Sequence, residues 1–280
     1  MNETDAMQEE GTPMWRRWAD SHPVTAFFLL TYLFSWSVWW LVMPLAADAG
    51  WGLRTAVHTV GLCGPTVAAL LMSGLLHGRK GIGQLLKRIT YWRVGIGWYL
   101  FALFSTLGIG YAAIGVHSLF GGVTPPLSLP LVYAQALAAG LPEEYGWRGF
   151  ALPYLLKKNG ALASSLVIAF FWVLWHLPIS PALKNPMVLG LFLLEVVPLT
   201  ILFTWLYINT GGSILLVVLY HLVANAVVSV LNIPEVPSLW AIYVCMLWLT
   251  ALLVVVRFGG PRLSSFSKWT SPAALGEPAP

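Results

Sequence analysis

Residues 187–208 read MVLGLFLLEVVPLTILFTWLYI, a run in which Glu195 is the only charged side chain. A helix of about 20 mostly apolar residues is long enough to cross the hydrocarbon core of a bilayer. Seven further runs have this character, at 24–45, 56–76, 96–120, 127–156, 161–177, 213–232 and 238–257. The pattern predicts an all-α fold, a polytopic membrane helix bundle of about eight transmembrane helices.

The composition excludes an ordinary soluble protein. The 280 residues are 58% hydrophobic and only 9% charged, whereas soluble domains carry roughly 25% charged residues. Eight spans with short loops use up most of the chain, so we predict a single transmembrane domain at 24–258. A cytoplasmic segment at 1–23 and a flexible cytoplasmic tail at 259–280 would flank it. The two cysteines lie in apolar runs, which argues against a disulfide framework or a cysteine zinc site.

The basic residues indicate how the chain sits in the membrane. A net charge of +4 would suggest nucleic acid as a partner of a soluble protein, but here Lys and Arg gather in alternate loops. Twelve lie on one predicted side, among them Arg16, Arg17, Lys157 and Lys158, and two on the other. This asymmetry predicts a multi-pass plasma-membrane protein with both termini cytoplasmic, whose partner is the lipid bilayer and not nucleic acid. The aromatic and basic run 15–18 is interpreted as an interfacial anchor.

Charged groups inside the fourth apolar stretch need a reason, since each costs at least ~2.5–3.5 kcal/mol at mid-bilayer. Residues 141–148 read LPEEYGWR, and Pro142 predicts a helix that breaks and restarts just before the acids. Glu144 and Arg148 are four residues apart and are predicted to form an ion pair. Glu143 is turned by about 100° from Glu144, so its carboxylate is left available as a general base.

Three further polar residues, from two separate stretches, lie deep in apolar sequence. His221 and Asn225 are four residues apart in the seventh stretch, so they share one helix face. His176 follows Trp172 by four residues near the end of the fifth stretch. Counting 1.5 Å per residue from the cytoplasmic ends places Glu143 and these three side chains at depths of ~12–22 Å. They can therefore meet in the middle of the membrane.

Taken in order, the three motifs are Glu143-Glu144-x-x-x-Arg148, Trp172-x-x-x-His176 and His221-x-x-x-Asn225. This ordered set resembles the CPBP intramembrane protease family, also called the Abi or CAAX-protease family. The resemblance covers the fourth to seventh spans, a protease core at about 127–232. One departure is Trp172, which stands where the family usually has Phe, and we expect its ring to pack and not to react.

The resemblance implies an intramembrane endopeptidase. In the family pattern Glu143, helped by His176, activates a water, while His221 and Asn225 hold the developing oxyanion. Glu144 and Arg148 would support the site. The implied substrate is a membrane-associated peptide or protein, with lipidated CAAX-type substrates as one class.

Alternatives remain at this stage. The resemblance favours a metal-free mechanism without a cofactor, but Glu143, His176 and His221 could together hold a zinc ion. The same polar groups would also suit an ion-coupled transporter or a non-catalytic membrane immunity or assembly factor. Glu195 either orients a site histidine or faces a wet cavity.

Overall fold

The computed structural model describes residues 13–46, 48, 50–127, 133–179 and 185–265, and it gives side chains for these except at 133–139. Within these ranges the chain is helical, with no strand. The α-helices are α2 (Met14–Ser21), α3 (Pro23–Ser37), α4 (Trp51–Leu62), α5 (Gly64–Lys87), α6 (Ile96–Leu119), α7 (Tyr133–Gly146), α8 (Leu152–Leu156), α9 (Ala161–His176), α10 (Pro186–Asn209), α11 (Ile214–Val230) and α12 (Pro237–Phe258). Two π-helices, η1 (Val38–Val42) and η4 (Trp147–Ala151), and four short 3-10 turns complete the helical structure: η2 (Pro44–Ala46), η3 (Arg88–Thr90), η5 (Leu177–Ile179) and η7 (Ile233–Glu235).

The predicted polytopic helical bundle is confirmed. Six helical segments of the described chain are long and apolar enough to cross a membrane: Pro23–Ala46, Trp51–Thr90, Ile96–Leu119, Ala161–Ile179, Pro186–Asn209 and Pro237–Phe258. Helix α11 is apolar but shorter. In the remaining predicted stretch, 127–156, α7, η4 and α8 follow one another without a gap, but this run is not among the six segments. The number eight therefore stays a prediction.

Prolines and polar caps set several helix starts. Pro23, Pro186 and Pro237 each stand in the first turn of their helices, α3, α10 and α12, where the missing N–H costs nothing. The Asn185 side chain accepts hydrogen bonds from two first-turn amides of α10. The Ser213 side chain does the same for one amide of α11. These side chains accept hydrogen bonds from first-turn backbone N–H groups, for which the hydrocarbon of a bilayer offers no acceptor.

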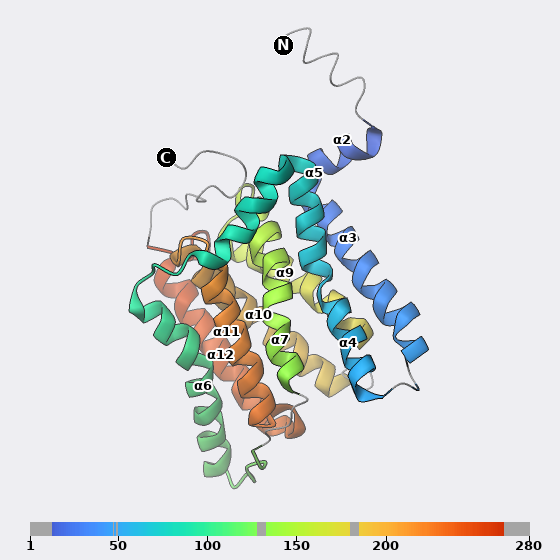
Figure 1. The fold of residues 1–280 in the computed structure, drawn as a ribbon. Coiled ribbons are helices and arrows are strands. Elements are labelled where there is room, and N and C mark those ends of the chain that lie inside the picture. The colour runs from blue at the N-terminus through green and yellow to red at the C-terminus, as the bar shows by residue number, and fades with distance from the viewer. Residues whose placement is uncertain (1–12, 47, 49, 128–132, 180–184, 266–280) are drawn as a thin grey trace.

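Helix α5 turns away from the bundle axis at one glycine. Gly78 has φ 61° and ψ −157°, a conformation that other residues rarely adopt. The apolar part of α5 ends there, and the basic residues Arg79 and Lys80 follow at once. The kink and α2 lie at the same end of the bundle, whereas the end of α6 and the start of α4 lie at the other (Figure 1).

Helices α7 and α11 lie side by side in the middle of the bundle (Figure 1). Glycines allow α7 to approach its neighbours closely. A Cβ atom on Gly146 would lie 2.4 Å from the Pro65 Cβ of α5, and one on Gly140 would lie 3.2 Å from the His221 Cβ of α11. Small residues at such contacts are typical of packed membrane helices. They hold the segment with the acidic pair against both partners.

The predicted helix break before the acids is wrong. Helix α7 continues through Pro142 to Gly146, and the irregular segment is the π-helix η4, which follows the acids. The Thr66 hydroxyl of α5 donates a hydrogen bond to the Pro142 carbonyl. This bond ties α7 to α5 at the proline. Membrane helices tolerate an internal proline where they are packed against other helices.

The tail predicted to be flexible from residue 259 is docked over its first residues. The carbonyls of Gly260 and Pro261 accept hydrogen bonds from the amides of Leu162 and Ala161, at 2.9 and 2.8 Å. These amides belong to the first turn of α9 and have no acceptor within their own helix. The Leu263 side chain is fully buried. Residues 266–280, like 1–12, lie outside the described residues.

Candidate active site

The predicted ion pair between Glu144 and Arg148 is confirmed. The Arg148 Nη1 atom donates to both carboxylate oxygens of Glu144, at 2.9 and 3.1 Å. Both side chains are completely buried. Glu144 lies near the end of α7 and Arg148 in η4. π-helical turns within longer helices are frequent at functional sites.

Aromatic rings and a second arginine hold η4 in place. The Arg148 guanidinium lies 5.0 Å from the Trp172 ring centroid and 4.3 Å from that of Phe203, within cation–π range. Arg88 Nη1 donates to the Gly149 carbonyl of η4 at 2.7 Å. Arg88 is one of the twelve basic residues on the predicted cytoplasmic side, but its side chain is buried. The segment that carries Arg148 is thus fixed from two sides.

Glu143 is hydrogen-bonded to Trp172, a residue for which the sequence predicted only a packing role. The Trp172 indole N–H donates to Glu143 Oε2 at 2.7 Å, and both groups are buried. We expected the Trp172 ring only to pack. The sequence did hold a signal for this bond, namely a tryptophan at position 172 where the family usually has phenylalanine. Tryptophan carries an N–H donor that phenylalanine lacks. Glu143 Oε1 has no such bond to Trp172 and is the oxygen left for another partner.

His176 has one ring nitrogen occupied. Its Nδ1 lies 2.8 Å from the Trp172 carbonyl oxygen. A carbonyl can only accept, so Nδ1 carries the hydrogen and Nε2 presents a lone pair in the neutral ring. The imidazole packs edge-on against Trp175 and Phe192, with centroid distances of 4.7 and 5.7 Å. These contacts fix the direction in which Nε2 points.

His221 connects α11 to the acidic pair. Its Nδ1 lies 2.8 Å from Glu144 Oε1, and the ring is almost fully buried. Glu144 therefore binds both Arg148 and His221, which the sequence spacing could not reveal. Asn225 lies one helical turn further along α11 and is half-buried.

The three motifs converge on one indole. Trp172 is hydrogen-bonded to Glu143, and its ring centroid lies 5.5 Å from that of His176 and 5.6 Å from that of His221. Charge interactions also connect Glu143 with His221, Glu144 and Arg148. Residues from α7, η4, α9 and α11 thus form one buried polar cluster, in which Glu143, His176 and His221 meet around Trp172. It combines a carboxylate with an open oxygen, two oriented imidazoles and an ion pair. The catalytic roles of the six residues and the place of Asn225 stay predictions.

The described residues contain no group of side chains placed to bind the zinc ion of the alternative prediction. Across the described ranges, no group of three or more His, Cys, Asp or Glu side chains is arranged to hold a metal ion. Glu143, His176 and His221 are therefore not arranged as such a group in the part of the chain that the structure describes. The metal-free mechanism stays a prediction.

Glu195 has a partner away from this cluster. Its Oε2 accepts a hydrogen bond from the Trp240 indole N–H of α12 at 2.6 Å. The carboxyl group is buried, with 7% of the residue exposed. The partner is thus a tryptophan and not a site histidine.

Comparison with known proteins agrees with the motifs. Residues 125–227, which include all six predicted site residues, match the family model described as type II CAAX prenyl endopeptidase Rce1-like. The chain is also 30% identical over 106 residues to the CAAX prenyl protease 2 of Methanococcus maripaludis. That alignment covers 35% of this chain and 39% of the relative, so the chain spans less than half of the relative's length. The predicted family resemblance is confirmed.

Proposed function

We propose that this chain, whose residues 125–227 match the model of the Rce1-like type II CAAX prenyl endopeptidase family, hydrolyses peptide bonds of membrane-associated substrates. The observation that carries the proposal is the convergence of Glu143, His176 and His221 around Trp172 in a buried setting. An intramembrane acid with ordered neighbours is best explained by function. The family match supplies the reaction class.

Glu143 acts as the general base. Oε1 accepts a proton from a water molecule while the Trp172 indole holds Oε2. The lone pair on His176 Nε2 accepts a hydrogen bond from the second O–H of this water and so orients the water oxygen. The water oxygen attacks the scissile carbonyl carbon, the C–N bond breaks, and the proton on Glu143 passes to the leaving amine.

His221 and Asn225 stabilise the oxyanion that forms on the carbonyl oxygen. His221 Nδ1 is engaged by Glu144, so Nε2 can donate to an oxyanion only when the ring is protonated. The ionised Glu144, held by Arg148, provides the negative charge that this form of the ring requires. Donors aimed at a developing oxyanion typically contribute 10²–10³ in rate each.

The substrate is a membrane-associated peptide or protein, and a lipidated CAAX-type C-terminus is the class we propose to test first. The name of the methanococcal relative, CAAX prenyl protease 2, supports this choice. A buried site among membrane helices suits a substrate that is delivered from the bilayer.

The membrane arrangement completes the proposal. We infer eight passes, with α7, η4 and α8 together forming the fourth, and both termini in the cytoplasm. The clustering of Lys and Arg in alternate loops supports this orientation.

The test uses the full-length protein in proteoliposomes. The substrate is a quenched fluorescent peptide with a farnesylated C-terminal CAAX motif, and its unprenylated form is assayed in parallel. Glu143→Gln should abolish cleavage because an amide cannot accept the proton. Thermal unfolding in detergent checks that the variant folds.

Glu195→Gln is the matched control, because Glu195 is also a buried intramembrane acid held by an indole N–H. It should cleave like the native protein. Full activity of folded Glu143→Gln would refute the assignment of the base. If neither peptide is cleaved, mass spectrometry of membranes from cells with native or Glu143→Gln protein should reveal unprocessed peptides in the variant, and identical profiles would refute proteolysis.

A further inference from the structure

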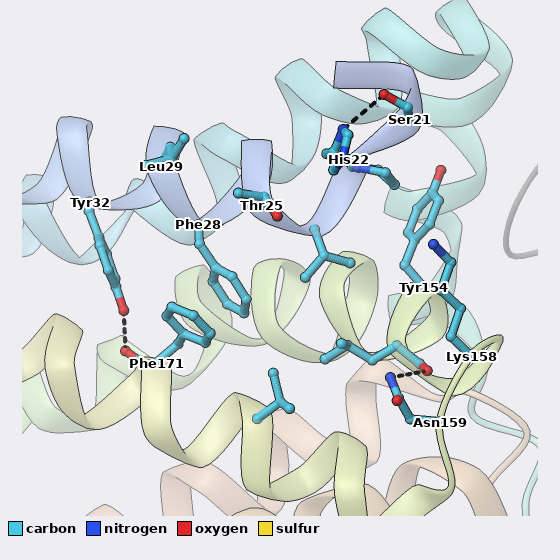
Figure 2. A pocket seen from close by; sticks show the side chains of 14 residues that line it. Ser21, His22, Thr25, Phe28, Leu29, Tyr32, Tyr154, Lys158, Asn159 and Phe171 are labelled. Carbon is cyan, nitrogen blue, oxygen red and sulfur yellow. Dashed lines mark hydrogen bonds between the residues drawn. The ribbon is translucent and has the colours of Figure 1, made fainter. Parts of the chain in front are cut away.

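A second site lies between α3 and α9, outside the catalytic cluster. A cavity of about 390 Å³ runs along these helices and is bounded by the end of α2 and by the α8–α9 connection (Figure 2). We call it the α3–α9 groove. None of the six predicted site residues lines it. Its volume falls in the range of small-molecule sites, ~300–1,000 Å³.

One end of the groove is apolar. Phe28 stacks on Phe171 with ring centroids 3.9 Å apart, and Leu29 and Val167 add aliphatic wall. The Tyr32 hydroxyl donates to the Phe171 carbonyl at 2.7 Å, so both polar atoms are already paired (Figure 2). This end offers contact area to a hydrocarbon chain and demands no hydrogen bond from it.

The other end is polar and basic. Ser21, His22, Lys158 and Asn159 lie together there, opposite the Tyr32 end (Figure 2). Asn159 donates its side-chain amide to the Leu155 carbonyl, and the Lys158 side chain is exposed.

Positive charge dominates around this end. Lys157 Nζ lies 5.7 Å from the Tyr154 ring centroid, at the groove wall. Arg16 and Arg17 stand on α2, which leads directly into the groove. The acid on that helix is Asp20, which interacts electrostatically with Tyr154. Lys158 lines the groove itself, while Lys157, Arg16 and Arg17 lie on the segments that adjoin it, where Arg16 donates to the Leu75 carbonyl of α5.

The tryptophans of α2 mark the depth of the polar end. Trp15 and Trp18 expose 63% and 41% of their surfaces on this short helix. Exposed tryptophans beside basic residues are typical of the membrane interface. The basic end therefore lies at headgroup level and the apolar end among the acyl chains.

We propose that the α3–α9 groove binds one anionic phospholipid of the adjoining leaflet. An acyl chain lies between Phe28 and Val167, and the phosphate lies against Lys158. Basic pockets between membrane helices on the cytoplasmic side suit anionic lipid headgroups. The orientation inferred above places this end in the cytoplasmic leaflet, where such lipids are abundant. The inference does not depend on proteolysis.

The test measures lipid retention by the full-length protein. Protein is reconstituted in nanodiscs of equal phosphatidylglycerol and phosphatidylcholine, released into mild detergent, and analysed by native mass spectrometry. The native protein should retain phosphatidylglycerol in preference to phosphatidylcholine. Lys158→Glu should lower phosphatidylglycerol retention at least about fivefold, because loss of one surface charge alone has that effect and the new carboxylate repels the lipid. Lys80→Glu, an exposed lysine of α5 that does not line the groove, should change it less than twofold.

A second variant tests the apolar part. Val167→Trp should fill the groove and reduce retention of both lipids, whereas Glu143→Gln should retain them like the native protein. Equal retention of the two lipids by the native protein, or equal losses in Lys158→Glu and Lys80→Glu, would overturn the proposal. Displacement of phosphatidylglycerol by a stoichiometric farnesylated peptide would also overturn it, because the groove would then belong to the substrate.

Discussion

Replacing Trp172 with Phe isolates the hydrogen bond that orients the catalytic carboxylate. Phenylalanine keeps a ring against Arg148, His176 and His221 but loses the N–H that donates to Glu143 at 2.7 Å. A hydrogen bond to a charged group contributes ~1.5–3 kcal/mol, and each 1.36 kcal/mol is a tenfold change in rate. We therefore expect kcat to fall by about 10- to 100-fold.

The assay is cleavage of the fluorescent peptide in proteoliposomes, with kcat and KM measured separately. KM should change little, since Trp172 acts on the base and not on the bulk of the substrate. Trp205→Phe is the matched control. Trp205 is a buried tryptophan of α10 whose ring contacts include Trp98 and Phe101, and its indole N–H has no acceptor among the described residues. The Trp205→Phe variant loses no hydrogen bond and should keep its kcat. Equal kcat in the two variants would refute the reasoning.

Three further substitutions test how the site is held. Gly146→Ala would place a Cβ atom 2.4 Å from Pro65, so the melting temperature in detergent should fall with a loss of about 1–3 kcal/mol; an unchanged melting temperature would contradict the close α5–α7 contact. Arg88→Met leaves the buried Gly149 carbonyl without its donor. The free energy of unfolding should fall by about 1–3 kcal/mol, and cleavage should be slower. Unfolding and activity like those of the native protein would show that η4 needs no such support. Arg148→Lys keeps the charge but loses the planar group that lies between two aromatic rings, so cleavage should drop at least tenfold in protein that still inserts, and native-like kinetics would argue that charge alone suffices.

The membrane class and the chemistry of the cluster were predictable from the sequence. Hydropathy decides the class because a bilayer admits only segments that are apolar and internally hydrogen-bonded. Charged residues inside such segments are rare, so the cost of burial singled out Glu143, Glu144 and Arg148 together with Glu195, and the ordered motifs then separated the site residues from Glu195. The spacing of four also predicted the Glu144–Arg148 pair correctly, because that contact lies within one helical turn.

Contacts between helices were beyond the reach of sequence spacing. The bonds from Trp172 to Glu143, from His221 to Glu144 and from Arg88 to Gly149 each join segments far apart in the chain. They depend on which helices pack together and on how closely glycines let them approach. The position of the irregular turn was likewise a tertiary outcome. Pro142 marked a local weakness, but α7 continues through it where it packs against α5, and the chain departs from the α-helix only at Trp147. The local sequence thus determined which polar groups are buried in apolar segments, while helix packing determined which hydrogen-bond partners each of them has.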